Sequence, residues 1–220
     1  DYYKRAIRFK PDSSIAYYNL GRALNQKGEK EEAISFYKKA IEIKPNFAPP
    51  HYSLGNALLA KQKTEEAISY YKMAIRFKPG YFQAHNNLGN ALSSARKTDE
   101  AISHYETAIK LSPEIAEAHI NIGNALLGIQ ENEKAISHYK VAIKLKPDYA
   151  ISHNNLGFAL AKQGRVNKAI SHYKIAIRLK PDAEAHFNLG TALFTDRKTT
   201  EAISNFKIAI KLKPEYHDAY

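Results

Sequence analysis

A proline recurs along the chain at a spacing of 34 residues, apart from a final spacing of 33. The members of this column are Pro11, Pro45, Pro79, Pro113, Pro147, Pro181 and Pro214. A glycine column keeps step with it at Gly21, Gly55, Gly89, Gly123, Gly157 and Gly190, and an alanine column at Ala33, Ala67, Ala101, Ala135, Ala169 and Ala202. Columns that stay in register at this period indicate a solenoid, in which stacked repeats bury a core that one repeat alone cannot.

Each repeat contains two segments whose apolar residues recur at helical spacing. Leu20 and Leu24 share one face of a first helix, and Tyr37 and Ile41 share one face of a second. Proline ends the second helix because it cannot continue the hydrogen-bond ladder. A short turn joins the two helices and contains Gly28, Gln62, Arg96, Gln130, Gly164 and Arg197 in successive repeats. The sequence therefore predicts an all-α solenoid of helix-turn-helix repeats.

Small residues and aromatic residues suggest how the two helices pack. The glycine and alanine columns let two backbones approach closely where the helices cross. We expect the space between layers to be filled by Tyr37, Tyr71, Tyr105, Tyr139, Tyr173 and Phe206. Thr64 and Thr98 precede acidic residues and are expected to be N-caps of second helices. One residue is missing between Pro181 and His186, so we expect a shorter loop there without loss of the helical register of Leu189 and Leu193.

The periodicity also predicts the organisation of the chain, which we treat as a single array over residues 1–220. Residues 1–13 form a partial repeat and residues 217–220 begin a further one. The full repeats are expected at 14–47, 48–81, 82–115, 116–149, 150–182 and 183–216. The chain begins with Asp1, which suggests a piece of a longer protein, and both incomplete repeats are expected to pack against their neighbours.

Three segments resemble the tetratricopeptide repeat: His85-Asn-Asn-Leu-Gly-Asn-Ala-Leu92, Glu100-Ala-Ile-Ser-His-Tyr105 and Ala142-Ile-Lys-Leu-Lys-Pro147. The resemblance covers essentially the whole chain. It implies a right-handed superhelix whose first helices line the concave side. One departure is that histidine replaces the aromatic residue that usually opens the first helix, at His51, His85, His119, His153 and His186. The family does not imply one function, because fold and function are separable.

Catalysis and metal binding find little support in the residue pattern. The chain has no cysteine, no glycine-rich phosphate loop and no nucleophile elbow. Histidines of one column lie on neighbouring repeats, and packed helices are about 8–10 Å apart, whereas a Zn–N bond is about 2 Å. We therefore expect histidines that pack or are solvated, no metal, no cofactor, no catalytic residue and no small-molecule substrate. The chain is not expected to be an enzyme.

The net charge is +11, which favours an acidic partner if the charge is concentrated. Twelve of the 33 Lys and Arg residues lie just before the prolines, at the ends of the second helices. There, cations complement the helix dipole, and we prefer this role to a dedicated anion site. These residues are Arg8, Lys10, Lys44, Arg76, Lys78, Lys110, Lys144, Lys146, Arg178, Lys180, Lys211 and Lys213. Nucleic acid and membrane are not the expected partners.

Asparagines in the first helices are the candidate binding residues. They lie before the Leu-Gly or Ile-Gly pair at Asn19, Asn87, Asn121, Asn155 and Asn188, and after that glycine at Asn56, Asn90 and Asn124. Asparagine is a poor helix former, and its amide offers both a donor and an acceptor to an extended peptide backbone. The rows resemble the asparagine ladder of the O-linked N-acetylglucosamine transferase superhelix. Side-chain contacts are expected from Tyr18, Tyr52, Phe158 and Phe187. The alternative is that these asparagines are only the family's consensus.

Three functions fit these observations. The first is a protein-protein interaction scaffold that binds an extended polypeptide in a concave groove lined by asparagines. The second is a structural element that associates end to end with its own copies. The third is the substrate-recognition arm of a larger enzyme, such as a glycosyltransferase. A lysine and arginine clamp for a terminal carboxylate is not expected, because its places hold Tyr18, Tyr52, Asn86, Ile120, Asn154 and Phe187. The sequence does not identify a cellular compartment.

Overall fold

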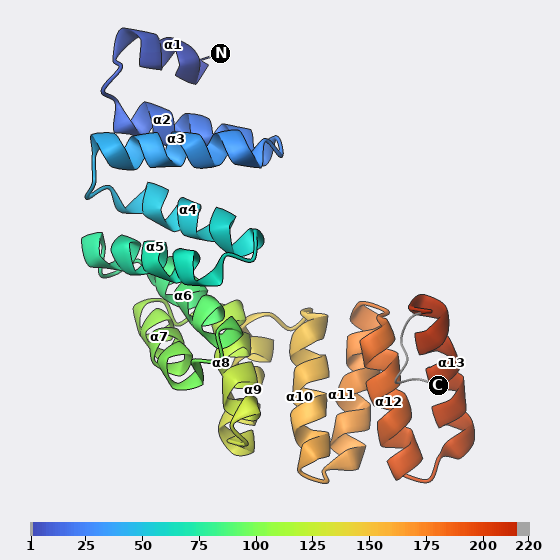
Figure 1. Cartoon of the computed structure of the whole chain (residues 1–220). Helices are drawn as coiled ribbons and strands as arrows, with labels where there is room; N and C mark the ends of the chain where they lie inside the picture. The colour runs from blue at the N-terminus through green and yellow to red at the C-terminus, as the bar shows by residue number, and fades with distance from the viewer. Residues whose placement is uncertain (1, 215–220) are drawn as a thin grey trace. The chain divides into compact units, whose positions relative to one another are not determined.

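A computed structural model describes residues 2–214, and within that range the regular structure is entirely α-helical (Figure 1). The prediction of an all-α repeat fold is confirmed. The helices are α1 (Tyr2–Phe9), α2 (Ser14–Gln26), α3 (Lys30–Ile43), α4 (Ala48–Ala60), α5 (Thr64–Phe77), α6 (Phe82–Ser94), α7 (Thr98–Leu111), α8 (Ala116–Gly128), α9 (Asn132–Leu145), α10 (Ala150–Lys162), α11 (Val166–Leu179), α12 (Ala183–Thr195) and α13 (Thr199–Leu212). The incomplete repeat expected at 217–220 lies outside the described residues.

The contacts between helices divide the chain into two compact units, residues 1–113 and 114–220. In the N-terminal unit the hairpins α2–α3, α4–α5 and α6–α7 stack in chain order, and α1 packs on α2. In the C-terminal unit the hairpins α8–α9, α10–α11 and α12–α13 stack in the same way (Figure 1). First helices of neighbouring repeats also touch, as α2 touches α4 and α10 touches α12. Each unit therefore presents a wall of first helices.

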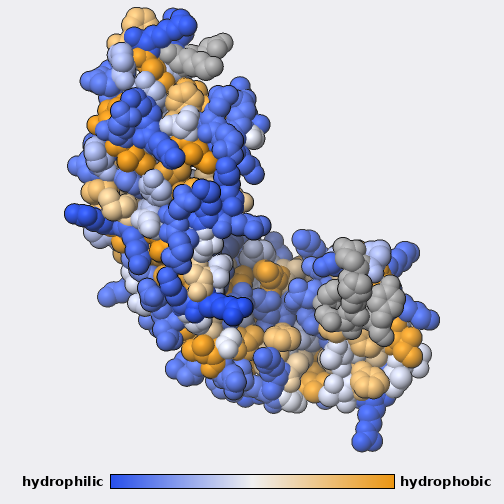
Figure 2. Space-filling model, in the orientation of Figure 1, coloured by the Kyte–Doolittle hydropathy of each residue, from blue (hydrophilic) through white to orange (hydrophobic). Residues whose placement is uncertain are grey.

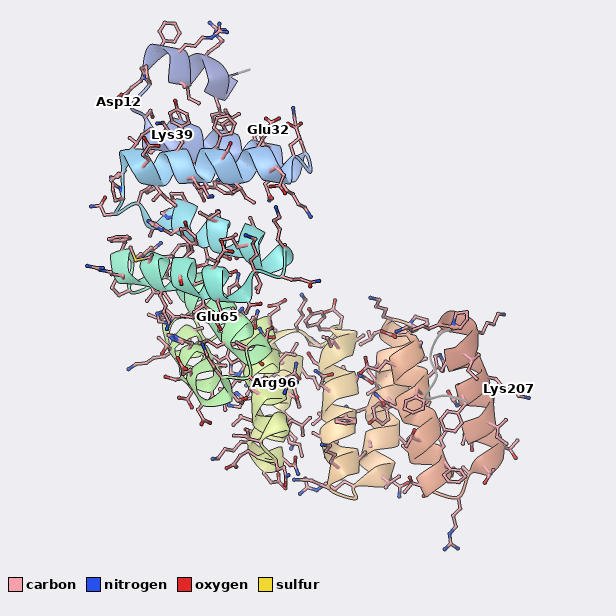
Figure 3. The ribbon with its side chains drawn as sticks, in the orientation of Figure 1. Asp12, Glu32, Lys39, Glu65, Arg96 and Lys207 are labelled. Carbon is pink, nitrogen blue, oxygen red and sulfur yellow. The ribbon has the colours of Figure 1, made fainter. Side chains whose placement is uncertain are left out.

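The turns inside the hairpins have a left-handed residue at their centre. Its φ is +87° at Gly28 and +72° at Gly164, and between 60° and 66° at Gln62, Arg96, Gln130 and Arg197. A residue in this left-handed conformation commonly ends a helix, and glycine adopts the conformation without steric cost. Arg96 is labelled in Figure 3. The prediction that Thr64 and Thr98 are N-caps is wrong, because both are the first residues of their helices. The N-caps are Lys63 and Lys97, and neither lysine side chain makes a cap hydrogen bond.

The glycine column is required by close packing inside each hairpin. A Cβ atom added at Gly123 would lie 2.6 Å from the ring of Tyr139, and one added at Gly89 would lie 2.5 Å from the ring of Tyr105. The same clash recurs in every full repeat, because each glycine faces the aromatic residue of its own second helix. The tyrosine rings are buried, as expected for the residues that fill the space between layers. Glycine is needed here for its lack of a side chain rather than for its flexibility.

Histidines form pairs within single repeats, which the sequence analysis did not anticipate. The Nδ1 atoms of His85 and His104 are 3.0 Å apart, those of His119 and His138 3.0 Å, and those of His153 and His172 3.1 Å. His85 also places Nε2 3.1 Å from the carbonyl oxygen of Pro79. Since a carbonyl only accepts, His85 carries its proton on Nε2, and its Nδ1 accepts a hydrogen bond from His104. The pairs are packed between the two helices of a hairpin, which confirms that the first-helix histidines belong to the core.

Burial governs the protonation of these histidines. It lowers the pKa of His85, and together with the neighbouring histidine and Lys72 it lowers the pKa of His104, while Glu100 opposes the shift. Burial and the partner histidine lower the pKa of His138 in the same way. The lowered pKa values favour the neutral form of His85, His104 and His138 at physiological pH.

The shortened loop before α12 keeps its helix in register. Gly190 of α12 faces Phe206 at the same distance as the other glycines face their tyrosines, and Leu189 and Leu193 are buried. The prediction for this loop is confirmed. Asp182 caps α12 by accepting a hydrogen bond from the amide of Glu184 at 3.0 Å.

Candidate polypeptide-binding groove

The predicted asparagines all lie on first helices, and two pairs of them are hydrogen-bonded to each other between neighbouring repeats. In the N-terminal unit the Tyr71 hydroxyl donates to Asn56 Oδ1 at 2.8 Å, and Asn87 Nδ2 donates to the same oxygen at 2.8 Å. Asn87 Nδ2 also lies 3.1 Å from the Tyr52 hydroxyl. One amide oxygen thus joins the second helix of a repeat to the first helix of the next repeat.

The C-terminal unit repeats this arrangement. The Tyr139 hydroxyl donates to Asn124 Oδ1 at 2.7 Å, and Asn155 Nδ2 donates to it at 2.9 Å. Within the described part of the chain, Asn124 Nδ2 and Asn155 Oδ1 are left without a partner. Asn124 is exposed and Asn155 is half-buried. The two side chains therefore present a donor and an acceptor to the groove from adjacent repeats, which is the pattern of an extended peptide backbone.

The network changes where the sequence departs from its pattern. Phe158 stands where an asparagine would accept from Asn188, and Asn188 Nδ2 instead donates to Asn154 Oδ1 at 3.1 Å. Asn154 Nδ2 in turn donates to Glu184 at 3.1 Å, and Asn154 is buried. Asn154 was not among the predicted site residues. The signal that could have revealed these bonds is the constant separation of 15 residues between each asparagine and its tyrosine, seen also for Asn90 and Tyr105 at 2.8 Å.

Three adjoining cavities lie along α8, α10 and α12 and define what we call the C-terminal groove. The first, of about 490 Å³, is lined by Tyr149, Ile151, Asn154, Asn155, Lys180 and Glu184. The second, of about 510 Å³, shares Asn155 and Glu184 with the first and adds Asn124, Phe158, Phe187 and Asn188. The third, of about 310 Å³, shares the last three of these residues with the second and extends to Thr191 and Thr195. The predicted residues Asn124, Asn155, Phe158, Phe187 and Asn188 are thus brought together.

The N-terminal unit differs from this. One cavity there has about 210 Å³ and is lined by Asn25, Lys30, Tyr37, Ser53, Asn56 and Ala57. The predicted residues Tyr18 and Tyr52 contact other aromatic rings: Tyr18 meets Phe47 edge-on at 5.5 Å between ring centroids, and Tyr52 lies 4.9 Å from Tyr81. The space-filling view in Figure 2 shows strips of hydrophobic residues between hydrophilic ones over this unit. Its wall therefore combines paired aromatic rings with the amides of Asn56 and Asn87.

The basic residues before the prolines lie at the ends of the second helices, as expected. Four of them also lie over aromatic rings. Lys44 Nζ is 5.8 Å from the centroid of Phe47, and Arg76 Cζ is 5.9 Å from that of Phe77. Lys78 Nζ is 4.7 Å from the centroid of Tyr81, and Lys146 Nζ is 4.3 Å from that of Tyr149. Other charges project away from the helices, as Lys207 does on α13 (Figure 3).

Neither a metal site nor a membrane span emerges from the described helices. No cluster of three or more His, Cys, Asp or Glu residues within residues 2–214 could hold a metal ion. None of the helices in that range is long and apolar enough to cross a membrane. Ser35, Ser69 and Ser171 recur at one position of the second helices, and each donates to a backbone carbonyl of its own helix, at 2.7, 3.1 and 3.1 Å.

Comparison with known proteins identifies the class. The family model described as TPR repeat matches residues 21–62, 55–94 and 129–164, and models described as tetratricopeptide repeat match residues 82–115, 154–217 and 2–35. The chain belongs to the tetratricopeptide repeat family, whose members are generally protein-interaction scaffolds. No curated protein matches the chain in sequence.

Solved structures share the fold. YrrB, a TPR protein with an unusual peptide-binding site, superimposes with a TM-score of 0.73 at 24% identity, over 90% of this chain and 98% of its own. PilF of Pseudomonas aeruginosa gives a TM-score of 0.82 at 20% identity, over 94% of both chains. MamA gives a TM-score of 0.67 at 27% identity, over 74% of this chain and 96% of its own. Identities this low carry the fold but no particular partner.

Proposed function

We propose that this interaction scaffold binds an extended segment of another protein in its C-terminal groove. The observation that carries the proposal is the continuity of three cavities along α8, α10 and α12. Asn155 lines the first and second cavities, and Asn188 lines the second and third. Asn124 and Asn155 offer a donor and an acceptor that the internal network leaves free. Phe158 and Phe187 supply apolar contacts beside them. Asn19, Asn56, Asn87, Asn90 and Asn121 are candidate backbone contacts in the other repeats.

The groove favours backbone recognition with modest side-chain selection. A typical hydrogen bond contributes about 0.5–1.5 kcal/mol net, so several amide contacts give useful affinity that tolerates sequence changes in the partner. Phe158 is 40% exposed, which leaves part of its ring for an apolar side chain of the ligand. Lys162 and Lys180 stand among the lining residues beside Glu184. The cations would increase the rate of encounter with acidic segments, and added salt would reduce that effect.

The experiment begins with selection of binding peptides from a random library displayed on phage, with the purified chain as bait. Affinities of the selected peptides are then measured for the wild type and for the double variant Asn155→Ala/Asn188→Ala. Loss of two or more hydrogen bonds should weaken binding about tenfold. N-methylation of alternate peptide amides should weaken it similarly, because the methyl groups remove backbone donors.

The matched control is Asn167→Ala, which removes an exposed amide from the second helix α11 of the same unit. We expect it to bind as the wild type does. If the double variant binds normally while Lys144→Glu/Lys146→Glu abolishes binding, the basic helix ends are the site and the groove proposal is wrong.

A further inference from the structure

We propose that the N-terminal unit carries a second, separate site that binds a proline-rich segment with acidic residues. The site, which we call the aromatic surface, consists of Tyr18, Arg22, Phe47, Tyr52 and Tyr81, together with Lys44 and Lys78. It lies on the wall formed by α2, α4 and α6, with Phe47 and Tyr81 at the N-caps of α4 and α6. None of these residues lines the C-terminal groove.

The rings form two adjacent pairs. Tyr18 and Phe47 meet at 77°, and Tyr52 and Tyr81 are tilted by 41°. Burial, with the nearby hydroxyls of Tyr18 and Tyr52, raises the pKa of Tyr81 to about 12, and Arg22 opposes the shift, so the groups of both pairs lie near one another. All four rings are half-buried, so each keeps part of its surface in solvent. Tyr18 and Tyr52 rest on the buried Tyr37 and Tyr71, with centroids 6.0 and 6.1 Å apart, which holds them in place.

Cations surround these rings. Arg22 Cζ lies 5.8 Å from the centroid of Tyr18, and Lys44 and Lys78 lie over Phe47 and Tyr81. Within residues 2–214, none of the three cations forms an ion pair. The N-terminal unit contains eighteen Lys and Arg against eleven Asp and Glu, a formal net charge of +7, whereas the C-terminal unit has fifteen against eleven and a net charge of +4. The surface therefore favours a ligand with negative charge.

The polar groups of the aromatic surface are mainly donors. Arg22, Lys44 and Lys78 can only donate hydrogen bonds, and the tyrosine hydroxyls can donate as well. A proline-rich backbone is a matching ligand, because its carbonyl groups accept while its prolines have no N–H. Such segments adopt a polyproline II helix before binding, so they lose little conformational entropy on aromatic-lined surfaces. Acidic side chains between the prolines would pair with the three cations.

The aromatic surface is not a consequence of the repeat itself. The residues that correspond to Tyr18 and Tyr52 in the C-terminal unit are Ile120, Asn154 and Phe187. Ile120 and Asn154 are buried, and the α12 N-cap that corresponds to Phe47 is Asp182. The position of Arg22 is occupied by Asn56, Asn90 or Asn124 in later repeats. A cation–ring pair at the same place in the repeat also occurs in the C-terminal unit, where Lys146 lies over the N-cap residue Tyr149, but Ile120 stands there in place of the second ring.

The test uses fluorescein-labelled peptides and fluorescence anisotropy on the whole chain. A peptide with the repeated sequence Pro-Pro-Glu should bind. A peptide of equal length and charge with the repeat Gly-Ser-Glu should bind at least about tenfold more weakly, because it lacks the proline rings and the preformed helix. A Pro-Pro-Lys peptide should not bind. The double variant Arg22→Glu/Lys78→Glu, at two exposed positions, should weaken Pro-Pro-Glu binding by at least about tenfold.

The matched control is Lys174→Glu/Lys207→Glu, which changes the total charge equally at exposed positions on α11 and α13. It should bind Pro-Pro-Glu within a factor of about two of the wild type. Equal binding of the Gly-Ser-Glu peptide, or an equal loss in the control, would show attraction by net charge alone and overturn the proposal. Tighter binding of a labelled oligothymidylate that competes with the peptide would overturn it in favour of nucleic acid. No binding of Pro-Pro-Glu would also overturn it, while leaving the C-terminal groove to its own test with Asn155 and Asn188.

Discussion

The two units have the same core and different walls. In both, a glycine of the first helix packs on the aromatic ring of the second, and a turn with a left-handed residue joins the helices. Both walls carry asparagine amides, but the N-terminal unit adds paired aromatic rings and cations, whereas the C-terminal unit adds Glu184 and three adjoining cavities. The difference indicates that the repeat specifies the fold through a few small and aromatic positions. The remaining positions of the first helix are free to specify the partner.

The largest expected effect tests whether the two cores are equivalent. Gly89→Ala in the N-terminal unit and Gly123→Ala in the C-terminal unit should each destabilise the protein by about 1–3 kcal/mol, because the added methyl overlaps a buried tyrosine ring. Gly128→Ala is the matched control, since it lies on α8 with Gly123 and has no atom within 4 Å of the new Cβ. Urea unfolding monitored by circular dichroism measures all three. If only one of the two variants were destabilised, the cores of the two units would not be equivalent.

The second effect concerns the histidine pairs, which occur in both units. The pKa values of His51, His85, His104, His138 and His172 are lowered in the folded state, mainly by burial. A histidine with a lowered pKa binds more protons when unfolded, so its contribution to stability is complete above about pH 6.5 and is lost as the pH falls below that value. Each unit by which folding lowers the pKa of a histidine corresponds to about 1.4 kcal/mol in the free energy of unfolding. We expect the free energy of unfolding to fall between pH 7.5 and pH 5.

The chain supplies its own control for this pH dependence. In the last repeat His186 Nδ1 donates to Asn205 Oδ1 at 2.9 Å, a bond that survives protonation of the imidazole. The triple variant His104→Asn, His138→Asn and His172→Asn should therefore lose less stability between the same two pH values. Thermal melts across the pH series provide the measurement. If the melting temperature of the triple variant falls with pH as steeply as that of the wild type, carboxylates rather than histidines govern the loss of stability in acid.

A smaller effect separates the repeats by their amide partners. Tyr139→Phe should cost about 1 kcal/mol, because it removes the hydroxyl that donates to Asn124. Tyr173→Phe should cost less, since Phe158 stands in place of that asparagine and the described residues include no amide partner for this hydroxyl. Phe206 already fills the equivalent position without a hydroxyl. If urea unfolding shows the same loss of stability for Tyr139→Phe and Tyr173→Phe, the amide network adds no stability.

The sequence predicted the fold more fully than the site. The proline, glycine and tyrosine columns predicted the helices and their contacts, because close packing restricts those positions to a few residue types. The asparagine rows were correctly placed on the first helices, but their bonds to Tyr71, Tyr139 and one another were not foreseen. Nor was the pairing of His85 with His104, because histidines were compared only within one column. Contacts between columns depend on how two helices are rotated about their axes, which a repeat pattern does not contain.

The smallest expected effect tests the ion pairs that join neighbouring repeats. Lys97 lies 3.3 Å from Glu65 in the N-terminal unit, and Arg165 lies 2.6 Å from Glu133 in the C-terminal unit. Both pairs are exposed, and exposed pairs contribute about 0.2–1 kcal/mol. Glu65→Gln and Glu133→Gln should each destabilise the protein by no more than this, and high salt should remove the difference. Glu133 also lies in the first turn of α9, where its charge favours the helix dipole. Comparing the double variant Glu133→Gln/Arg165→Gln with each single variant separates the ion pair from the helix-dipole interaction. If the destabilisation by Glu133→Gln comes from the dipole alone, Arg165→Gln by itself will leave the free energy of unfolding unchanged.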